Sequence, residues 1–500
     1  MHPRPRPAAG PPLDRRSFLR GSFLAAGALA LPPALLAACG DATSSSAGPL
    51  VVDPNRPWWL QGNFASVHDE IDAFDLPVRG KLPPELDGLY ARNGSNPQAD
   101  DSPHWFLGDG MVHGVRLERG RARWYRNRYV RTAFYEGGIS FDEAIGAGLP
   151  PGGANGTSNV SVIFQGGRLL SSGEIGAAFE IDPRDLSTVG VHTFDGRASN
   201  SFTAHAKVDP ATGYLHFFGY WFLPPYLTYY VADETGRVIS AEPIATEKPT
   251  MIHSFAITDR EAVFWECPVV FDLQNALEEP LAGFKWTPEY GARIGILPFG
   301  RPGSEIRWVE IEPCYVFHDV NAFRDGDDVV IDVSRLPSVF ATGNRGDGDS
   351  TVTRWRVGTG GAQLTFRDEL VSRSQLDLAT HDRRFTGRAE YSNGWFAQFR
   401  SHPDTVDLGG IGRIDFRTGA EEIWDPGLHR HAGEALFVPA GAGEGEGYVL
   451  AFVYDRGRDA SVLAVFEALR IARGPIAEVE LPRRVPFGFH GWWVPGEHVG

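Results

Sequence analysis

Four histidines stand far apart in the chain, each inside or beside an apolar segment that is typical of a β-strand. They are His205 in SFTAHAKV, His253 in TMIHSFAI, His318 in CYVFHDVNAF and His490 in PFGFHGWWV. Three of them take the place of an expected apolar residue, and a buried imidazole needs hydrogen-bond partners or a metal ion. Because imidazole binds iron, copper, nickel and zinc, the four residues predict a redox metal centre.

Each of these histidines also has an ordinary interpretation. The chain contains 15 histidines, and a single histidine on an apolar strand is usually a core residue with satisfied hydrogen bonds. The shared apolar context favours the metal for the four together. The others lie in loop-like or polar stretches and are not assigned to the metal, for example His104, His113, His381, His429 and His431.

The spacing of the four histidines indicates what kind of fold must position them. They are separated by 48, 65 and 172 residues, which corresponds to one, one and about three blades if a propeller blade takes roughly 50 to 65 residues. The inner strands of a propeller converge on its axis and could surround one ion. A sandwich array or a large barrel is the alternative, but a sandwich would place the histidines on separate faces.

The composition favours many short strands joined by tight turns. Glycine (59) and proline (37) make up about a fifth of the 500 residues, and 12% are aromatic. Segments from Asp to Gly at 209–213, 233–236 and 415–419 are flanked by aromatic and β-branched runs, which predicts antiparallel hairpins. A helical pattern is confined to short pieces such as 272–279. We therefore expect one all-β domain over 58–500.

The net charge bears on binding to nucleic acid, and the cysteine content bears on disulfide bonds. A net charge of −16 argues against nucleic acid as a partner. Only Cys267 and Cys314 remain in the predicted domain, so we expect buried free thiols, although a single disulfide bridge between them is the alternative. We expect the protein to be a monomer.

The N-terminus resembles an export signal. Arg15 and Arg16 in DRRSFLRG precede an apolar stretch over 22–38, the order expected of a twin-arginine signal. A transmembrane helix is the alternative, but Pro32 and Pro33 interrupt the stretch. The signal ends in LAACG, which resembles a lipoprotein cleavage box with Cys39 as the lipidated residue.

These patterns predict a signal over 1–39, a polar linker over 40–57 and a periplasmic or cell-envelope protein held by a lipid anchor, with an apolar patch as a further membrane contact. Because this export route carries folded proteins, a metal could be inserted before export.

Several segments resemble the carotenoid cleavage oxygenase family. They are the four histidine segments together with LDGLYARNGSNP, HWFLGDGMVHGVRL, RNRYVRT, FKWTPEYGARIGILP and the final PFGFHGWWV, in order from about residue 58 to 494. The resemblance implies a seven-bladed β-propeller, capped by loops and short helices, with a ferrous ion on its axis. It carries the four ligands over onto His205, His253, His318 and His490.

The resemblance also implies three carboxylates that hold the second nitrogen of three of the histidines, as metal-bound imidazoles generally require. Glu174 in LLSSGEIG and Glu434 in HAGEALFVP match the family's glutamates. By its offset from RRFTGR, the third position is Asp377, where the family has Glu. Because aspartate is one methylene shorter, we expect its hydrogen bond to be longer, bridged by water or replaced.

The activity implied by the resemblance is iron-dependent use of dioxygen to cleave one double bond of a carotenoid or apocarotenoid into two carbonyl products. The protein would position the polyene in an apolar tunnel. Aromatic residues near the motifs are candidates for its wall: Phe106, Phe134, Phe255, Trp286, Phe317, Phe487 and Trp492.

Three alternatives stay open. One branch of the family cleaves stilbenes with a lysine shortly after the RNRYVRT stretch, where this chain has Ala133, Phe134 and Tyr135, although Tyr135 could contact a phenol. Another branch isomerises and hydrolyses retinyl esters. A hypothesis of a different class is a propeller that binds apolar ligands and has lost catalysis.

Overall fold

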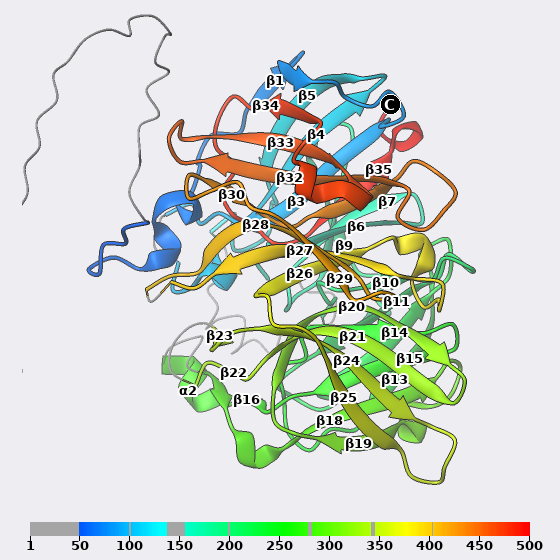
Figure 1. Cartoon of the computed structure of the whole chain (residues 1–500). Helices are drawn as coiled ribbons and strands as arrows, with labels where there is room; N and C mark the ends of the chain where they lie inside the picture. Colours follow the sequence, from blue (N-terminus) through cyan, green and yellow to red (C-terminus); the bar gives the residue numbers. More distant parts are fainter. Residues whose placement is uncertain are drawn as a thin grey trace, which may run out of the picture. The chain divides into compact units, whose positions relative to one another are not determined.

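Seven antiparallel sheets form the blades of a β-propeller (Figure 1). The structure is a computed structural model that describes residues 50–99, 102–137, 156–198, 201–278, 283–341, 346–402 and 404–500. The predicted all-β, seven-bladed fold is confirmed. The predicted signal over 1–39, with Cys39, lies outside the described residues, and so does most of the predicted linker over 40–57. These boundaries stay predictions.

Five blades are antiparallel sheets whose strands follow chain order, with a small separate sheet inserted within blades 3 and 4, and we number the blades in chain order. Blade 1 comprises β6 (Ser161–Gln165), β7 (Arg168–Ser172), β8 (Ala178–Ile181) and β9 (Thr188–His192). Blade 2 comprises β10 (Lys207–Val208), β11 (Leu215–Tyr220), β12 (Leu227–Ala232) and β13 (Val238–Ile244). Blade 3 comprises β14 (Phe255–Ile257), β15 (Glu261–Glu266), β18 (Ala292–Pro298) and β19 (Arg307–Ile311). Blade 4 comprises β20 (Tyr315–Asp325), β21 (Asp328–Leu336), β24 (Thr351–Gly358) and β25 (Thr365–Ser372). Blade 5 comprises β26 (Leu376–His381), β27 (Asn393–Arg400), β28 (Asp407–Asp415) and β29 (Ala420–Trp424).

The last two blades combine strands from both ends of the described chain. Blade 6 comprises β2 (Val78–Gly80), β30 (Arg430–Ala432), β31 (Leu436–Pro439), β32 (Gly447–Asp455), β33 (Ala460–Glu467) and β34 (Ala477–Glu480). Blade 7 comprises β1 (Asp72–Phe74), β3 (Gly88–Ser95), β4 (Gly110–Glu118), β5 (Arg121–Tyr129) and β35 (Gly491–Pro495). The pairing of β3 with β35 closes the ring, and Figure 1 shows the blue and red ends of the chain side by side there. Because closure brings β35 to the centre, the segment just before it can reach the axis.

Short elements cover the blades. Two small sheets pair β16 (Val269–Phe271) with β17 (Phe284–Trp286), and β22 (Ser338–Val339) with β23 (Gly346–Asp347). The helical pattern near 272–279 is the α-helix α2 (Leu273–Glu278). Among the described residues, the other helical pieces are 3-10 turns: η1 (Trp58–Leu60), η2 (Gly62–Phe64), η3 (Trp105–Leu107), η5 (Pro288–Tyr290), η6 (Gly303–Glu305), η7 (Arg383–Phe385), η8 (Ala468–Arg473) and η9 (Gly496–His498). No helix of the described residues is long and apolar enough to span a membrane.

The turns predicted from the sequence connect neighbouring strands. The backbone N–H of Ala211 donates to Asp209 Oδ1, and that of Arg417 donates to Asp415 Oδ1, each at 2.9 Å. Gly213 has a φ of +72°, a conformation that glycine adopts without the steric cost of a Cβ. The predicted hairpins β10–β11, β12–β13 and β28–β29 are therefore confirmed.

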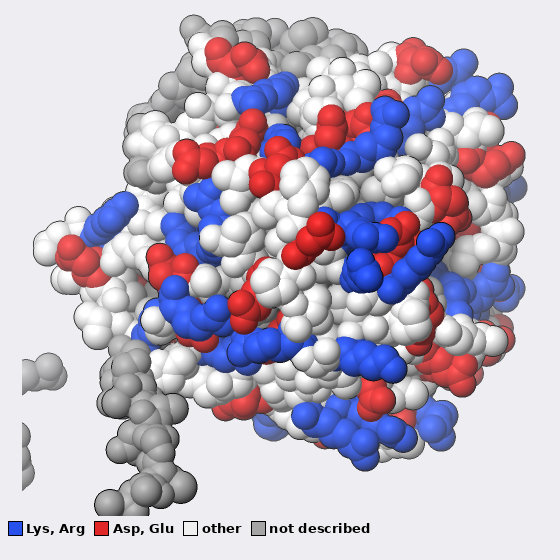
Figure 2. All heavy atoms as spheres, turned by 90° about the horizontal axis from the view of Figure 1, so that it is seen from above, with Lys and Arg blue, Asp and Glu red and all other residues white. Residues whose placement is uncertain are grey.

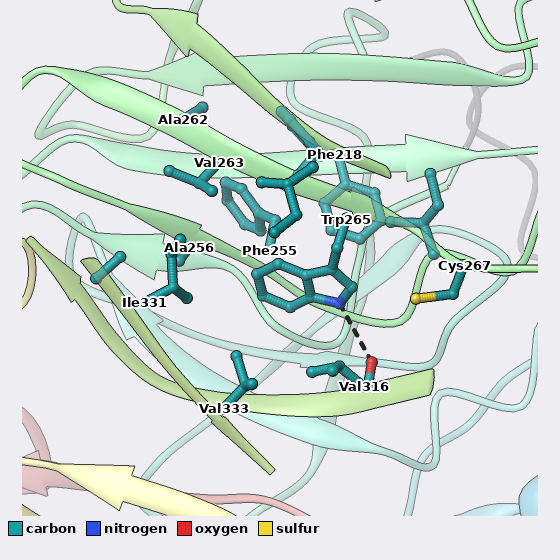
Figure 3. Close-up of a cluster of buried hydrophobic side chains, with 14 of the residues drawn as sticks. Phe218, Phe255, Ala256, Ala262, Val263, Trp265, Cys267, Val316, Ile331 and Val333 are labelled. Atoms are coloured by element: carbon teal, nitrogen blue, oxygen red, sulfur yellow. Dashed lines mark hydrogen bonds between the residues drawn. The ribbon is translucent and has the colours of Figure 1, made fainter. Parts of the chain in front are cut away.

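The cores lie between adjacent blades, so many strands are covered on both faces. All six residues of β15 are buried, which explains why it reads as a nearly continuous apolar run. Figure 3 shows the cluster around Trp265, whose indole N–H donates to the carbonyl of Val316 at 3.2 Å. Replacing a buried Trp by Ala costs on the order of 3–5 kcal/mol. Cys267 and Cys314 are buried free thiols, as expected.

Opposite charges alternate on the visible surface. Figure 2 shows Lys and Arg side chains interleaved with Asp and Glu side chains over one face. Ion pairs such as Arg126–Asp72 and Arg356–Asp325 neutralise neighbouring charges. That nucleic acid is not a partner stays a prediction from the net charge.

Candidate metal centre

The four predicted histidines come together at the starts of four inner strands. His205 and His253 lie two residues before β10 and β14, His490 lies directly before β35, and His318 lies within β20. His318 occupies an irregular part of its strand, because the pairing of β20 with β21 shifts register between Val316 and Asp319. The predicted spacing of one, one and three blades is confirmed, since these strands belong to blades 2, 3, 4 and 7. Of the four histidines, His318 lies within a strand. The other three lie just before the first paired residue of their strands, at the end that faces the axis.

The imidazole nitrogens converge at the distance that one ion would require. One ligand atom from each histidine lies within 4.8 Å of the others. The Nε2 atoms of His205 and His253 are 2.9 Å apart, and those of His318 and His490 are 3.1 Å apart. Two imidazole nitrogens that bind the same ion at about 2.1 Å and at a right angle would be about 3.0 Å apart. The donor set therefore fits a single metal ion.

Two predicted carboxylates contact the remaining nitrogen of their histidines. Glu174, which follows β7, contacts His253 Nδ1 through Oε1 and accepts a 2.5 Å hydrogen bond from the Tyr220 hydroxyl through Oε2. Glu434, between β30 and β31, accepts from His490 Nδ1 at 2.8 Å. A proton held on Nδ1 leaves the Nε2 lone pair free for a metal. The partner of Glu174, Tyr220, was not found from the sequence, and no motif pointed to it.

Asp377 makes a direct hydrogen bond, contrary to our expectation of a longer or bridged contact. His318 Nδ1 donates to Asp377 Oδ1 at 2.7 Å. Asp377 lies beside an irregular part of its strand: the pairing of β26 with β27 shifts register between Asp377 and Thr380, and Leu378 has a φ of +51°. A non-glycine residue in this region is strained, so the bulge is held by its surroundings.

Burial favours the neutral imidazole of His205 and His490, which is the form that binds metals. His253, His318 and His490 are 7–8% exposed. Burial, followed by the other three imidazoles, holds the pKa of His205 well below its usual range. Burial also lowers the pKa of His490 to about 4, although Glu434 opposes this. Charging a desolvated imidazole is unfavourable, so proton competition with a metal is weak near neutral pH.

The histidines that were not assigned to the metal lie outside the cluster, and two of them, His113 and His431, have hydrogen-bond partners in the core. His113 and His431 are buried, which their sequence context did not indicate. His113 Nδ1 lies 2.9 Å from the Tyr125 hydroxyl, and His431 Nδ1 donates to the carbonyl of Leu408 at 2.7 Å. These are core histidines with satisfied hydrogen bonds.

An apolar cavity of about 480 Å³ reaches three of the four histidines, His253, His318 and His490. Of the seven aromatic candidates, only Phe106 and Phe317 line it. Phe255 and Phe487 belong to buried cores, and Tyr135 packs against Tyr129 with a ring separation of 4.8 Å. Five other aromatic side chains of the wall were not predicted from the sequence, and they come from separate segments of the chain: Trp58, Trp105, Phe340, Phe399 and Phe489.

A second cavity of about 320 Å³ reaches the site from blades 1, 2, 4 and 5. It touches His205, His318 and His490, and its wall includes Lys207, Asp319 and Arg383. Arg383 lies 3.7 Å from the ring centre of Trp492, so this aromatic candidate lines the polar cavity instead of the apolar one. The site therefore lies between an apolar cavity and a more polar one.

A seven-bladed propeller with four convergent histidines at an apolar cavity defines a class of metal-binding proteins. A family model described as retinal pigment epithelial membrane protein matches residues 64–495. A carotenoid 9,10(9',10')-cleavage dioxygenase 1 from Arabidopsis thaliana is 33% identical over 501 residues, covering 88% of this chain and 90% of that protein. A carotenoid cleavage oxygenase from Mycobacterium tuberculosis is 34% identical, covering 87% of this chain and 97% of that protein. The chain belongs to the carotenoid cleavage oxygenase family.

Solved structures agree with this fold. The crystal structure of a lignostilbene dioxygenase from Pseudomonas brassicacearum superimposes with a TM-score of 0.79 and 26% identity, covering 88% of this chain and 99% of that chain. A cobalt-substituted apocarotenoid oxygenase from Synechocystis gives a TM-score of 0.74 at 24% identity, which shows the shared fold.

Proposed function

We propose that the protein is an iron(II)-dependent dioxygenase that cleaves one carbon–carbon double bond of a carotenoid or apocarotenoid into two carbonyl products. The observation that carries the proposal is the convergence of one nitrogen from each of the four histidines, three of which, His253, His318 and His490, border an apolar cavity. His205, His253, His318 and His490 would hold the iron, with Glu174, Asp377 and Glu434 fixing three of the rings. The iron would supply the activation of dioxygen. The complete set of ligands and carboxylate contacts disfavours a propeller that has lost catalysis.

The protein's own part in the reaction is to bind and orient the polyene. Phe317 lies in the cavity wall with its ring 5.0 Å from the ring of His253. Phe106 and Phe489 form part of the same wall, with ring centres 5.9 Å apart. Such a wall favours an extended apolar molecule and excludes bulk water from the reacting carbons.

The choice between polyene and stilbene substrates rests on three observations. The relatives described above that share a third of their sequence with this chain are named for carotenoid cleavage. The stilbene branch has a lysine shortly after the RNRYVRT stretch, but this chain has Ala133, Phe134 and Tyr135 there. Tyr135 does not line the apolar cavity. A stilbenoid is the second candidate, because the Pseudomonas enzyme that shares the fold is a lignostilbene dioxygenase.

The test is aerobic incubation of iron-loaded protein with carotenoids, apocarotenals and stilbenes, followed by mass analysis of the products. We expect paired aldehydes or ketones from a polyene. Products from stilbenes alone would favour the second candidate. Absence of stoichiometric iron after reconstitution, or of oxygen consumption with every compound, would contradict the dioxygenase proposal.

We also propose that the protein is exported by the twin-arginine route and anchored in the cell envelope through a lipid on Cys39. Support comes from Arg15 and Arg16, the apolar stretch over 22–38 and the LAACG box. Fractionation of cells that produce the wild type and the Cys39→Ser variant tests this. We expect the wild type in the membrane fraction and the variant in the soluble fraction of the envelope. Retention of both in the cytoplasm would contradict export.

A further inference from the structure

The four histidine rings differ in the hydrogen-bond partners that hold their Nδ1 atoms. His253, His318 and His490 each contact a carboxylate through Nδ1. Among the described residues, no carboxylate contacts the His205 ring, and the backbone N–H of His205 donates to Thr203 Oγ1 at 3.1 Å. The strand that follows, β10, pairs with β11 through only two residues. Something else must fix this ligand, because loosely held ligands weaken metal binding.

A buried polar network lies directly behind three of the ligands. Lys207 Nζ donates to both carboxylate oxygens of Asp319, at 2.9 and 3.0 Å. Ser254 Oγ donates to Asp319 Oδ1 at 2.8 Å. Asp319 is 6% exposed and Ser254 is fully buried. The carboxylate of Asp319 in blade 4 therefore accepts hydrogen bonds from residues of blades 2 and 3.

The positions of these residues in the chain link the network to the metal site. Lys207 stands two residues after His205, while Ser254 and Asp319 directly follow His253 and His318. The carboxylate of Asp319 thus ties together the starts of β10, β14 and β20, the inner strands of three consecutive blades. These are the points where strand pairing no longer restrains the backbone of His205 and His253.

Stability alone is a poor explanation for this ion pair. Asp319 is buried and Lys207 is partly buried, so both charges lose hydration, and replacing a buried ion pair by apolar residues is often neutral or stabilising. Lys207 and Asp319 also form part of the wall of the polar cavity that touches His205 and His318. The position of the Lys207–Asp319 ion pair is explained if the pair sets the distance between β10 and β20, the strands next to His205 and His318.

We propose that Asp319, with Lys207 and Ser254, is a positioning group for the metal centre and takes for His205 the place of the missing carboxylate. Lys207 restrains the backbone that carries His205, and Ser254 restrains the backbone that carries His253. This inference rests on the metal site of the proposed function but not on the substrate.

The test is metal binding by the Asp319→Asn variant, measured with Fe²⁺ in competition with a chelator and with Co²⁺ as a spectroscopic probe. Loss of a contact that orients ligands typically weakens metal binding 10–100-fold. We expect a weakening of about this size and a change in the visible absorption of bound Co²⁺, because the arrangement of the nitrogens changes. Ser254→Ala removes one hydroxyl without leaving an unpaired charge, so it serves if Asp319→Asn does not fold. We expect about fivefold weaker binding from it.

Asp332→Asn is the matched control. Asp332 lies in β21 of the same blade as Asp319, is fully buried and binds Arg354 at 2.8 and 2.9 Å, but no histidine ligand is its neighbour in sequence. We expect it to lower the unfolding temperature and to leave metal affinity and the Co²⁺ spectrum unchanged.

Wild-type affinity and spectrum in both Asp319→Asn and Ser254→Ala would overturn the positioning role. Equal weakening by the Asp332→Asn control would also overturn it, because the effect would then be general destabilisation. A wild-type protein that binds no metal would overturn this inference and the proposed function together. Tight metal binding without cleavage of any substrate would contradict the proposed function alone.

Discussion

The Asp377→Glu variant tests whether the shorter side chain of Asp377 weakens the support of His318, or whether the backbone already places the aspartate at the right distance. If Asp377 were only a shortened glutamate, the substitution would restore a better contact with His318. The structure indicates the opposite. His318 Nδ1 and Asp377 Oδ1 are already 2.7 Å apart, at the short end of the range for a hydrogen bond to a carboxylate. Another methylene adds about 1.5 Å to the side chain at a position that is only 9% exposed.

Asp377 borders the apolar cavity, so the added methylene meets crowding on the side of His318, where the contact is already short. Forcing one extra methylene into such a contact costs about 1–3 kcal/mol. If the metal-bound state bears this cost, iron binding weakens about 5–150-fold. The bulge at Leu378 opposes relaxation, because the backbone N–H of Leu378 also donates to Asp377 Oδ1, at 2.9 Å. We therefore expect Asp377→Glu to bind iron more weakly than the wild type.

The assay is anaerobic competition for Fe²⁺ between the apo-protein and a chelator of known affinity, with thermal unfolding of the apo-protein measured in parallel. Glu434→Asp is the reciprocal variant. Glu434 uses both oxygens, one for His490 Nδ1 at 2.8 Å and one for the backbone N–H of Gly491 at 2.7 Å. Its shortening should weaken iron binding about 10–100-fold. Tighter iron binding by Asp377→Glu, with unchanged stability, would refute the argument that the backbone already places Asp377 at the right distance.

Three further predictions concern the ligands, the cavity and the dependence on pH. His253→Ala should lose iron and turnover and keep the folded propeller, as measured by metal analysis and circular dichroism; wild-type turnover would refute the ligand assignment. Phe317→Ala should raise KM or shift the cleaved double bond at unchanged iron content, because the side chain contacts the cavity and not the metal; unaltered kinetics and products would show that Phe317 does not contact the substrate. Burial lowers the pKa of His216 to about 4, so the unfolded chain binds a proton first as the pH falls, and the free energy of unfolding decreases between about pH 6.5 and 4 by up to about 3 kcal/mol. Denaturant unfolding of wild type and His216→Gln across this range should give a shallower pH dependence for the variant, and equal slopes would contradict the assignment.

Some features of the site could be predicted because they are local in the sequence. A histidine in a segment such as CYVFHDVNAF signals a polar group in an apolar strand, and the spacing of the four histidines corresponds to whole blades. The turns at 209–213 and 415–419 were also predictable, because Asp side chains and Gly backbone conformations act within five residues. These signals favoured a propeller and gave the four candidate ligands, while the number of seven blades was implied by the family resemblance.

Other features depend on contacts between segments that the sequence does not connect. The aromatic wall of the apolar cavity draws on η1, η3, β20, β27 and the segment before β35, so its members could not be separated from ordinary core residues. The link from Lys207 through Asp319 to Ser254 joins positions up to 112 residues apart. Neither arrangement has a periodic or local sequence pattern.

The contact of Asp377 with His318 shows most clearly what the sequence could not predict and what depended on the tertiary structure. From the sequence, an aspartate in place of glutamate predicted a longer or bridged contact, because side-chain length was the only quantity available. In the structure, Asp377 lies beside a bulge in β26, and its contact with His318 is direct. The sequence determined which residue types are present and roughly how many blades separate them. The packing of the blades decided the distances between them, because backbone position, set by many distant contacts, outweighs the length of one side chain.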